Sequence, residues 1–299
     1  MIKSLQKSLR QRINSMVIAP NAIIFAIHEA FSIDLIMPFL RAVGMNARLR
    51  YGSLMKEFVG GVDSLQESIQ EDVFDIAQVE ADEVDKFVNR PYFGSTIVQR
   101  LDLLTAGMGA QAIQIFQDGL KSGLGYKEIQ NQIRQTLAVG GYKLERLVRT
   151  EGQRISNDIL LATYEKNKRW IDGIMFQATL DVRTCETCAQ YDRHEWWYLG
   201  TPNVAHAPYV PMHCFCRCIY TPISSAWRSE KRQRASMFGP VDKDYKEWLR
   251  GAEQNNPGFA KSILGRNYEA WRDGRYQLSA QFTPQITYAN YLTQTGGIR

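Results

Sequence analysis

The chain has 299 residues, 44% of them hydrophobic and 22% charged, which is ordinary for a globular protein with a substantial core. Its net charge of +5 permits contact with nucleic acid without requiring it. No run of about 18 apolar residues indicates a membrane helix, and no convincing signal peptide begins the chain, so we expect a protein made and kept in the cytosol.

The first third of the chain, residues 1–94, predicts helices of opposite charge. Apolar residues recur at helical spacing from Ile2 to Val17, and Lys and Arg occupy the other faces of this helix. Residues 62–88 place an acidic face beside an apolar stripe. Solvation explains both charged faces, although the basic helix could instead contact a membrane, DNA or a partner protein, and the acidic helix a basic partner.

The remaining pattern predicts a helical protein interrupted by one small module. We expect helices over 96–121, 126–138, 142–168, 244–252 and 267–274, and strands over 173–181 and 216–223. The Val-Gly-Gly stretch at 139–141 is expected to end the second of these helices. The predicted fold class is therefore mainly α-helical with a small α+β, zinc-stabilised module near 170–223.

A carboxylate interrupts the apolar stripe of the predicted 142–168 helix. The stripe consists of Leu144, Val148, Ile155, Ile159 and Ala162, and Glu151 occupies the position one turn after Val148. A buried carboxylate needs a partner, and Arg149 points elsewhere on the helix, so Arg183 or Arg217 would serve. Glu151 could be a catalytic acid or base. No companion carboxylate or histidine lies at motif spacing, which favours a structural clamp made by these residues.

All five cysteines lie within a short window of the chain. Cys185 and Cys188 form a C-x-x-C pair, and an H-C-x-C-x-C cluster follows at 213–218. Zinc takes four ligands in a tetrahedron, and two such clusters can supply them. The preferred ligands of one structural zinc ion are listed here with the substitute last: Cys185, Cys188, His213, Cys216 and Cys218. Cys214 adjoins His213 too closely to share the metal with it, and His194 is interpreted as an ordinary loop histidine.

Catalytic interpretations of this window are weaker. A thioredoxin-like C-x-x-C requires a βαβ context, which the sequence does not offer. A zinc deaminase requires H-x-E followed by P-C-x-x-C, and neither occurs. P-loop, G-x-S-x-G and H-E-x-x-H motifs are missing from the sequence as well. Because protein side chains can fill every ligand position, we expect a closed structural site and no enzyme.

Taken together, the Arg-Thr-Glu stretch at 149–151, "FQATLDVRTCETCAQYD" at 176–192 and "PMHCFCRC" at 211–218 resemble the phage Mu F-like minor head proteins, or phage head morphogenesis proteins. The matching residues are Arg149, Thr150, Glu151, Ala178, Asp181, Arg183, Thr184, Cys185, Cys188, His213, Cys216, Arg217 and Cys218. The sequence departs from the family pattern at Phe176, Arg193 and Cys214, where Trp, Gly and Pro are usual. The resemblance covers residues 95–285, with the zinc module at 173–223, and leaves 286–299 as a tail.

The resemblance implies a virion component that acts in head assembly at the portal vertex. The implied partners are the portal protein, the major capsid or scaffolding protein, and double-stranded DNA without sequence preference; no membrane is implied. The implied location is the head interior or portal vertex, and the host cytoplasm during assembly, with residues 1–94 available for docking to the portal or capsid.

Two alternatives stay open. Basic residues at Arg228, Lys231, Arg232 and Arg234 would suit a zinc-stabilised protein that binds nucleic acid without sequence preference. A hydrolase or transferase would instead use Glu151 and the cysteine window.

Overall fold

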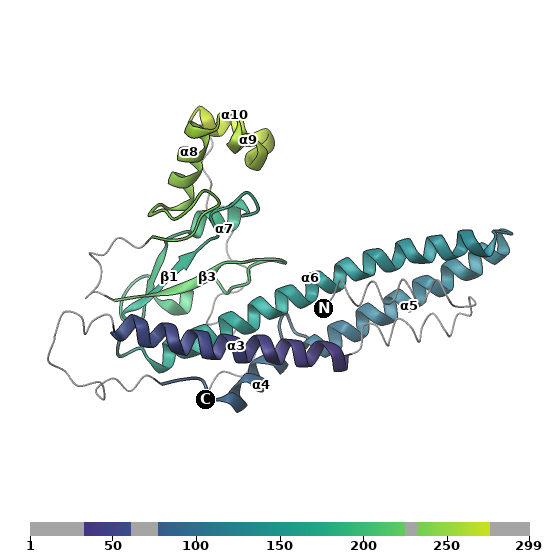
Figure 1. Ribbon diagram of the computed structural model, residues 1–299, viewed down its shortest axis with the longest axis horizontal. Helices are drawn as coiled ribbons and strands as arrows, with labels where there is room; N and C mark the ends of the chain where they lie inside the picture. The colour runs from purple at the N-terminus through teal and green to yellow at the C-terminus, as the bar shows by residue number, and fades with distance from the viewer. Residues whose placement is uncertain (1–32, 61–76, 225–232, 276–299) are drawn as a thin grey trace. The chain divides into compact units, whose positions relative to one another are not determined.

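The computed structural model describes residues 33–60, 77–224 and 233–275, which form a mainly helical protein with one small sheet, as predicted (Figure 1). The helices are α3 (Ile33–Gly60), α4 (Ala81–Asn89), α5 (Ile97–Lys121), α6 (Tyr126–Lys166), α7 (Glu186–Tyr191), α8 (Tyr245–Asn255), α9 (Phe259–Leu264) and α10 (Tyr268–Arg272). The described residues also contain the short 3₁₀ turns η2 (Val204–His206) and η4 (Gly265–Asn267), of which η4 joins α9 to α10. The predicted basic helix over 2–17 lies outside the described residues.

The chain divides into two compact units. The first comprises residues 1–46 with 80–155, and the second comprises residues 47–79 with 156–299. Helices α3 and α6 each contribute to both units. No helix in the described ranges is long and apolar enough to cross a membrane.

In the first unit, α5 and the first part of α6 run antiparallel as a long helical hairpin (Figure 1). One face of α6 is buried along its length at steps of four, four and three residues. The residues of this face are Ile129, Ile133, Leu137, Gly140, Leu144, Val148, Glu151 and Ile155. An eleven-residue period corresponds to about 3.67 residues per turn, close to that of a straight helix. The buried stripe can therefore follow α6 without strong supercoiling.

The predicted helix break at 139–141 is wrong, because α6 runs without interruption from Tyr126 to Lys166. A Cβ atom on Gly140 would lie only 2.4 Å from the terminal methyl of Met108 on α5, and one on Gly119 would lie 2.5 Å from Ile129. These glycines let the two helices approach closely. The packing of the hairpin outweighs the low helix propensity of glycine, roughly 1 kcal/mol per residue.

Helix α4 confirms only part of the predicted acidic helix over 62–88. It begins after Glu80, whose side chain and that of Glu83 form a capping box. The apolar residues Val84, Phe87 and Val88 are buried. Residues 77–80 are not helical, and 62–76 lie outside the described part of the chain.

The second unit contains a three-stranded antiparallel sheet in the order β2-β1-β3. Its strands are β1 (Gly173–Gln177), β2 (Glu195–Trp197) and β3 (Ile219–Ile223). Phe176 pairs with Tyr220 across the sheet, their rings meeting edge to face at 5.6 Å, and Trp196 meets Tyr220 at 6.1 Å. The two predicted strands are confirmed in part, since β1 and β3 are both shorter than expected. The sequence did not predict β2, because three residues are too few to show the alternating pattern of a strand.

Helices α8, α9 and α10 follow the sheet and share a small apolar core of their own. Tyr245, Trp248 and Leu249 of α8 pack with Leu264 of α9 and with Leu180, which follows β1. Helix α8 begins with a capping box between Asp244 and Glu247. The predicted helices over 244–252 and 267–274 are confirmed with shifted ends.

Candidate metal centre

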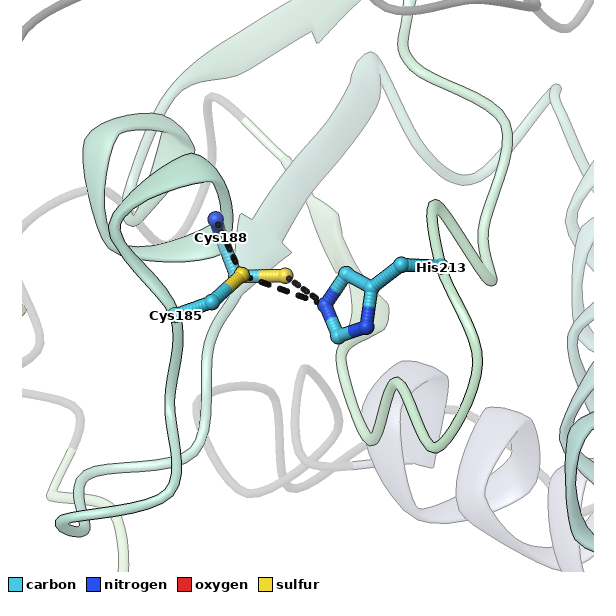
Figure 2. Close-up of side chains that lie close together, drawn as sticks. All are labelled: Cys185, Cys188 and His213. Carbon is cyan, nitrogen blue, oxygen red and sulfur yellow. Dashed lines mark hydrogen bonds between the residues drawn. The ribbon is translucent and has the colours of Figure 1, made fainter. Parts of the chain in front are cut away.

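The C-x-x-C pair begins helix α7. Cys185 is the N-cap residue of this helix, and its sulfur accepts a hydrogen bond from the backbone N–H of Cys188 at 3.4 Å. This turn places both sulfurs on one side of the helix start, where they face one edge of the His213 ring (Figure 2). The local sequence thus presents two thiols from a single short loop, as a metal site requires.

His213 arrives from the loop before β3 and completes a first group of donors. Its Nε2 atom lies 3.2 Å from the sulfur of Cys185 and 3.1 Å from that of Cys188. Its Nδ1 atom lies 2.8 Å from the backbone carbonyl oxygen of Cys214, which can only accept a hydrogen bond. That contact places a hydrogen on Nδ1 and directs Nε2 at the sulfurs, which is the usual arrangement for a histidine that binds a metal.

Cys188, Cys216 and Cys218 form a second group, so that Cys188 belongs to both. Each of these three residues is at most 3% exposed, and the sulfurs of Cys188 and Cys216 lie 3.9 Å apart. Cys214 is exposed and belongs to neither group. The loop turns back on itself at Phe215, whose φ of 61° is rare for a bulky residue. Such a conformation persists where the surroundings enforce it.

The donor distances suit a tetrahedral metal ion. Bond lengths of about 2.3 Å to sulfur and 2.0 Å to nitrogen predict edges of about 3.8 Å between sulfurs and about 3.6 Å between sulfur and nitrogen. The three observed separations of 3.1, 3.2 and 3.9 Å lie close to these values. All five cysteines are free thiols. The side chains of both groups could therefore hold a metal ion.

The cluster concentrates negative charge around one imidazole. A hydrogen bond from Cys188 is the main cause that lowers the pKa of Cys185 to about 4, and His213 lowers it further. The hydrogen bond to Cys185, followed by that to Cys216, raises the pKa of His213 to about 11. Hydrogen bonding from Cys188 also lowers the pKa of Cys216. Thiolates surrounding a bound proton are a favourable environment for a cation that replaces the proton.

Asp181 links the two cysteine segments. Both of its carboxylate oxygens accept hydrogen bonds from Arg217, which lies between Cys216 and Cys218, and one accepts from the backbone N–H of Arg183. The Arg217 guanidinium is the main cause that lowers the pKa of this carboxyl. A charged, bidentate pair of this kind holds the geometry of both loops. Arg183 and Arg217, which were predicted as partners of Glu151, thus contact Asp181 instead.

Asp192, just after α7, is a second buried hub, and sequence reasoning missed it. Its side chain is 1% exposed and accepts hydrogen bonds from the backbone N–H groups of Ala178 and Tyr245 and from the guanidinium of Arg234. It therefore connects β1, α7 and α8. Proteins of the family that the sequence resembles usually have Asp-Gly at this position. This chain keeps the aspartate and has Arg193 in place of the glycine, so Asp192 could have been noticed in the sequence.

The predicted partner of Glu151 is wrong, although its burial is confirmed. Glu151 is fully buried in the first unit, where it pairs with Arg100 at 2.6 Å and with Arg154 at 2.8 Å. Arg154 also donates to the carbonyl oxygens of Phe87 and Val88 at the end of α4. The clamp thus fastens α4 and α5 to α6 within the first unit, through Arg100 and Arg154 and not through the predicted Arg183 or Arg217.

Arg149 takes no part in this clamp. Its side chain is 63% exposed and pairs with Glu145, one turn earlier on the helix, at 3.3 Å.

The cysteine module is fastened to α6 by residues further along the helix. Asn157 donates to the carbonyl oxygen of Cys218 at 3.4 Å, and Tyr164 donates to that of Tyr220 at 3.2 Å. Asp158 accepts a 2.6 Å hydrogen bond from Tyr209 in the loop between the two cysteine segments. The cysteine module is therefore attached to α6 as expected, although the attachment uses Asn157, Asp158 and Tyr164 and not Glu151.

Two further interpretations agree with the structure. The sheet beside the C-x-x-C pair is antiparallel throughout, so the described residues provide no βαβ unit for thioredoxin-like chemistry. His194 belongs to neither donor group, and its ring packs against Tyr191 at 5.8 Å and Trp196 at 6.1 Å.

The fold and the site define a mainly helical protein whose small antiparallel sheet carries a buried cysteine and histidine cluster able to hold a metal ion. Residues 113–221, which include all the candidate ligands, match the family model described as phage Mu protein F like protein. The similarity to this family covers 109 of the 299 residues of the chain. Comparisons with curated proteins and with solved structures give no match.

Proposed function

We propose that this chain is a structural minor head protein of a tailed bacteriophage, acting at the portal vertex in head assembly and carrying no catalytic activity. The observation that supports the proposal is the Mu F-like domain at 113–221, since its family is one of phage head proteins. The resemblance of residues 95–285 extends this proposed assignment beyond the matched stretch and leaves residues 286–299 outside it.

The domain holds one structural zinc ion in this proposal. Cys185, Cys188, His213 and Cys216 would be the ligands, with Cys218 as the substitute for Cys216. A zinc ion bound by four side chains has no open position, so it would stabilise the fold and would not activate water. Protein purified without added zinc should contain about one equivalent per chain. Folded, metal-free protein with a Cys185–Cys188 disulfide would contradict the proposal.

The portal protein is the proposed main partner, with residues 1–94 as the docking region and the head interior or portal vertex as the location. Major capsid or scaffolding protein would be a secondary partner. The test is to express the chain together with the portal protein of its phage and to purify portal assemblies at high salt. Retention of the chain at about 1 M salt, where the Debye length is about 3 Å, would indicate apolar docking. Loss of the chain from the portal at every salt concentration would contradict portal docking.

Any contact with double-stranded DNA should be independent of sequence and should weaken steeply with salt, because it would rest on release of counterions. One of the four basic residues considered for this role has another partner, since Arg234 is paired with the buried Asp192. Arg228, Lys231 and Arg232 lie outside the described residues. DNA titrations at two salt concentrations distinguish the alternatives, and strong preference for one sequence would favour a regulatory DNA-binding protein instead.

A further inference from the structure

The metal cluster offers one donor more than a tetrahedral ion can use. Its donors form a first group of Cys185, Cys188 and His213 and a second group of Cys188, Cys216 and Cys218. The donor atoms within each group lie within 4.8 Å of one another. A structural zinc ion takes only four ligands, so two of these thiols must compete for one position on the ion.

Three donors, from Cys188, Cys216 and His213, face one another at the centre of the cluster. The sulfur of Cys188 lies 3.1 Å from Nε2 of His213 and 3.9 Å from the sulfur of Cys216. The pKa of His213 is raised first by Cys185 and then by a hydrogen bond with Cys216, so the Cys216 sulfur also reaches this imidazole. These three donors are called the shared ligands below, and they leave the fourth position of a tetrahedron to another thiol.

Cys185 and Cys218 approach the shared ligands from different groups. Cys185 belongs to the first group, where its sulfur lies 3.2 Å from Nε2 of His213 (Figure 2). Cys218 belongs to the second group, where its sulfur lies within 4.8 Å of those of Cys188 and Cys216. Either thiol would therefore complete the same kind of ligand set, which consists of three sulfurs and one nitrogen.

The two thiols differ in their access to solvent. Cys185 is half-buried at the start of α7, a helix of six residues, and His213 beside it is half-buried as well. Cys218 is 3% exposed, and the other members of the second group are no more exposed than this. An ion that arrives from solvent therefore meets Cys185 and His213 before it meets Cys218.

The backbone around Cys218 fixes this thiol in its interior position. Cys218 follows Cys216 by two residues just before β3, and side chains two residues apart in an extended chain face the same side. Arg217 between them instead donates two hydrogen bonds to Asp181. Asn157 of α6 donates to the carbonyl oxygen of Cys218 at 3.4 Å. The Cys218 sulfur is thus held beside the shared ligands by contacts that involve no metal.

We infer that Cys185 joins the shared ligands when an ion is taken up from solvent, and that Cys218 then replaces Cys185 and retains the ion in the interior. This inference rests on the proposed zinc site and adds an exchange between two of its thiols, in which Cys216 stays bound throughout. The bond from the metal to Cys185 breaks and the bond to Cys218 forms. The proton of the Cys218 thiol passes to the released Cys185 thiolate, so the charge of the cluster does not change.

Cobalt binding to the full chain tests whether the two thiols can replace each other, because the charge-transfer absorption of Co²⁺ increases with the number of bound thiolates. The variants are Cys185→Ser, which keeps an acceptor at the start of α7, Cys218→Ala, and the two changes combined. Each single variant should bind about one equivalent with the absorption of the wild type, whereas the double variant should lose about one third of it. Cys214→Ser, at the exposed cysteine outside both groups, is the matched control.

The rate of zinc release tests the separate roles of the two thiols. Zinc-loaded chains are mixed with excess EDTA, and free zinc-depleted protein is followed by its remaining metal content. Cys218→Ala should release zinc about tenfold faster than the wild type, because its ion stays with the half-buried ligands that solvent can reach. Cys185→Ser should release zinc no faster than the wild type, because its ion is held by the interior thiol.

The outcomes separate this inference from the proposed zinc site. A wild-type chain that binds neither zinc nor cobalt would overturn both. A wild-type chain that binds one equivalent, together with loss of metal from Cys185→Ser, would overturn the exchange alone, because Cys218 would then be unable to replace Cys185. Zinc release from Cys218→Ala at the wild-type rate would also overturn the exchange, and this result does not depend on how well the Cys185 variant folds.

Discussion

The helical hairpin of the first unit and the cysteine module of the second are stabilised in different ways. The hairpin buries one continuous stripe of α6 against α5, a helix of 25 residues. The sheet of the module has strands of three and five residues, which bury few side chains. Small structures of this size usually need a metal or a disulfide in addition to their core.

Both regions bury polar side chains, but these side chains find their hydrogen-bond and ion-pair partners in different ways. In the hairpin, Glu151 is paired with two arginines from helices that apolar packing already holds together. In the module, Asp181 and Asp192 each join separate segments of the chain, and the thiols of the cluster have one another and His213 as partners. Loss of a polar group should therefore weaken the hairpin locally, whereas it should release whole loops of the module.

The largest expected effect comes from the metal cluster. Cys188 belongs to both donor groups, so Cys188→Ser should abolish metal binding and unfold the module, because structural zinc contributes on the order of 10 kcal/mol. Metal content per chain and hydrogen exchange of residues 173–223 measure this, and α5 should stay protected. The control is Cys214→Ser at the exposed cysteine, which should change neither quantity. Full metal content in Cys188→Ser would rule out the cluster as the site.

A smaller effect is expected in the hairpin. Glu151→Ala leaves Arg100 and Arg154 beside each other in the interior, and it should reduce the free energy of unfolding by about 3–5 kcal/mol. The matched change on the surface of the same helix is Glu145→Ala, which removes the exposed pair with Arg149 and should cost less than about 0.5 kcal/mol. Urea unfolding compares the two variants, and equal losses would contradict the assigned burial of Glu151.

The close approach of the hairpin helices gives a pair of glycine variants with opposite signs. Gly119→Ala brings a methyl group against the branched side chain of Ile129 and should destabilise the protein by about 1–3 kcal/mol. Gly107→Ala, on the open face of α5, should stabilise it by up to about 1 kcal/mol through helix propensity. Thermal unfolding of both variants measures the two changes in stability. A stabilising Gly119→Ala would mean that α5 and α6 are further apart than described.

The smallest effect concerns the backbone of the module. Arg193 has a φ of 62° and pairs with Asp242 at 2.5 Å, and both Arg193→Gly and Arg193→Ala remove that pair. Only glycine adopts positive φ without strain, so the Gly variant should be more stable than the Ala variant by about 1 kcal/mol. Urea midpoints measure the difference. An Ala variant as stable as the Gly variant would indicate that the loop relaxes to negative φ.

Local pattern in the sequence determined much of this protein. The helical period indicated α5, α6 and α8, and the spacing of the cysteines indicated the donor groups, because both depend on residues close together in the chain. The Arg-Thr-Glu stretch and the cysteine window also resembled the Mu F-like family before any fold was available. Burial of Glu151 followed in the same way from its place in an apolar stripe.

Long-range contacts decided the rest. The sequence of "VGG" favours a helix end, yet packing against Met108 keeps α6 continuous, since tertiary contact outweighs a propensity of roughly 1 kcal/mol. The partners of Glu151 and Asp181 could not be chosen among many arginines, because an ion pair depends on distances between segments that local pattern does not contain. Asp192 became visible as a hub only where β1, α7 and α8 converge on its carboxylate.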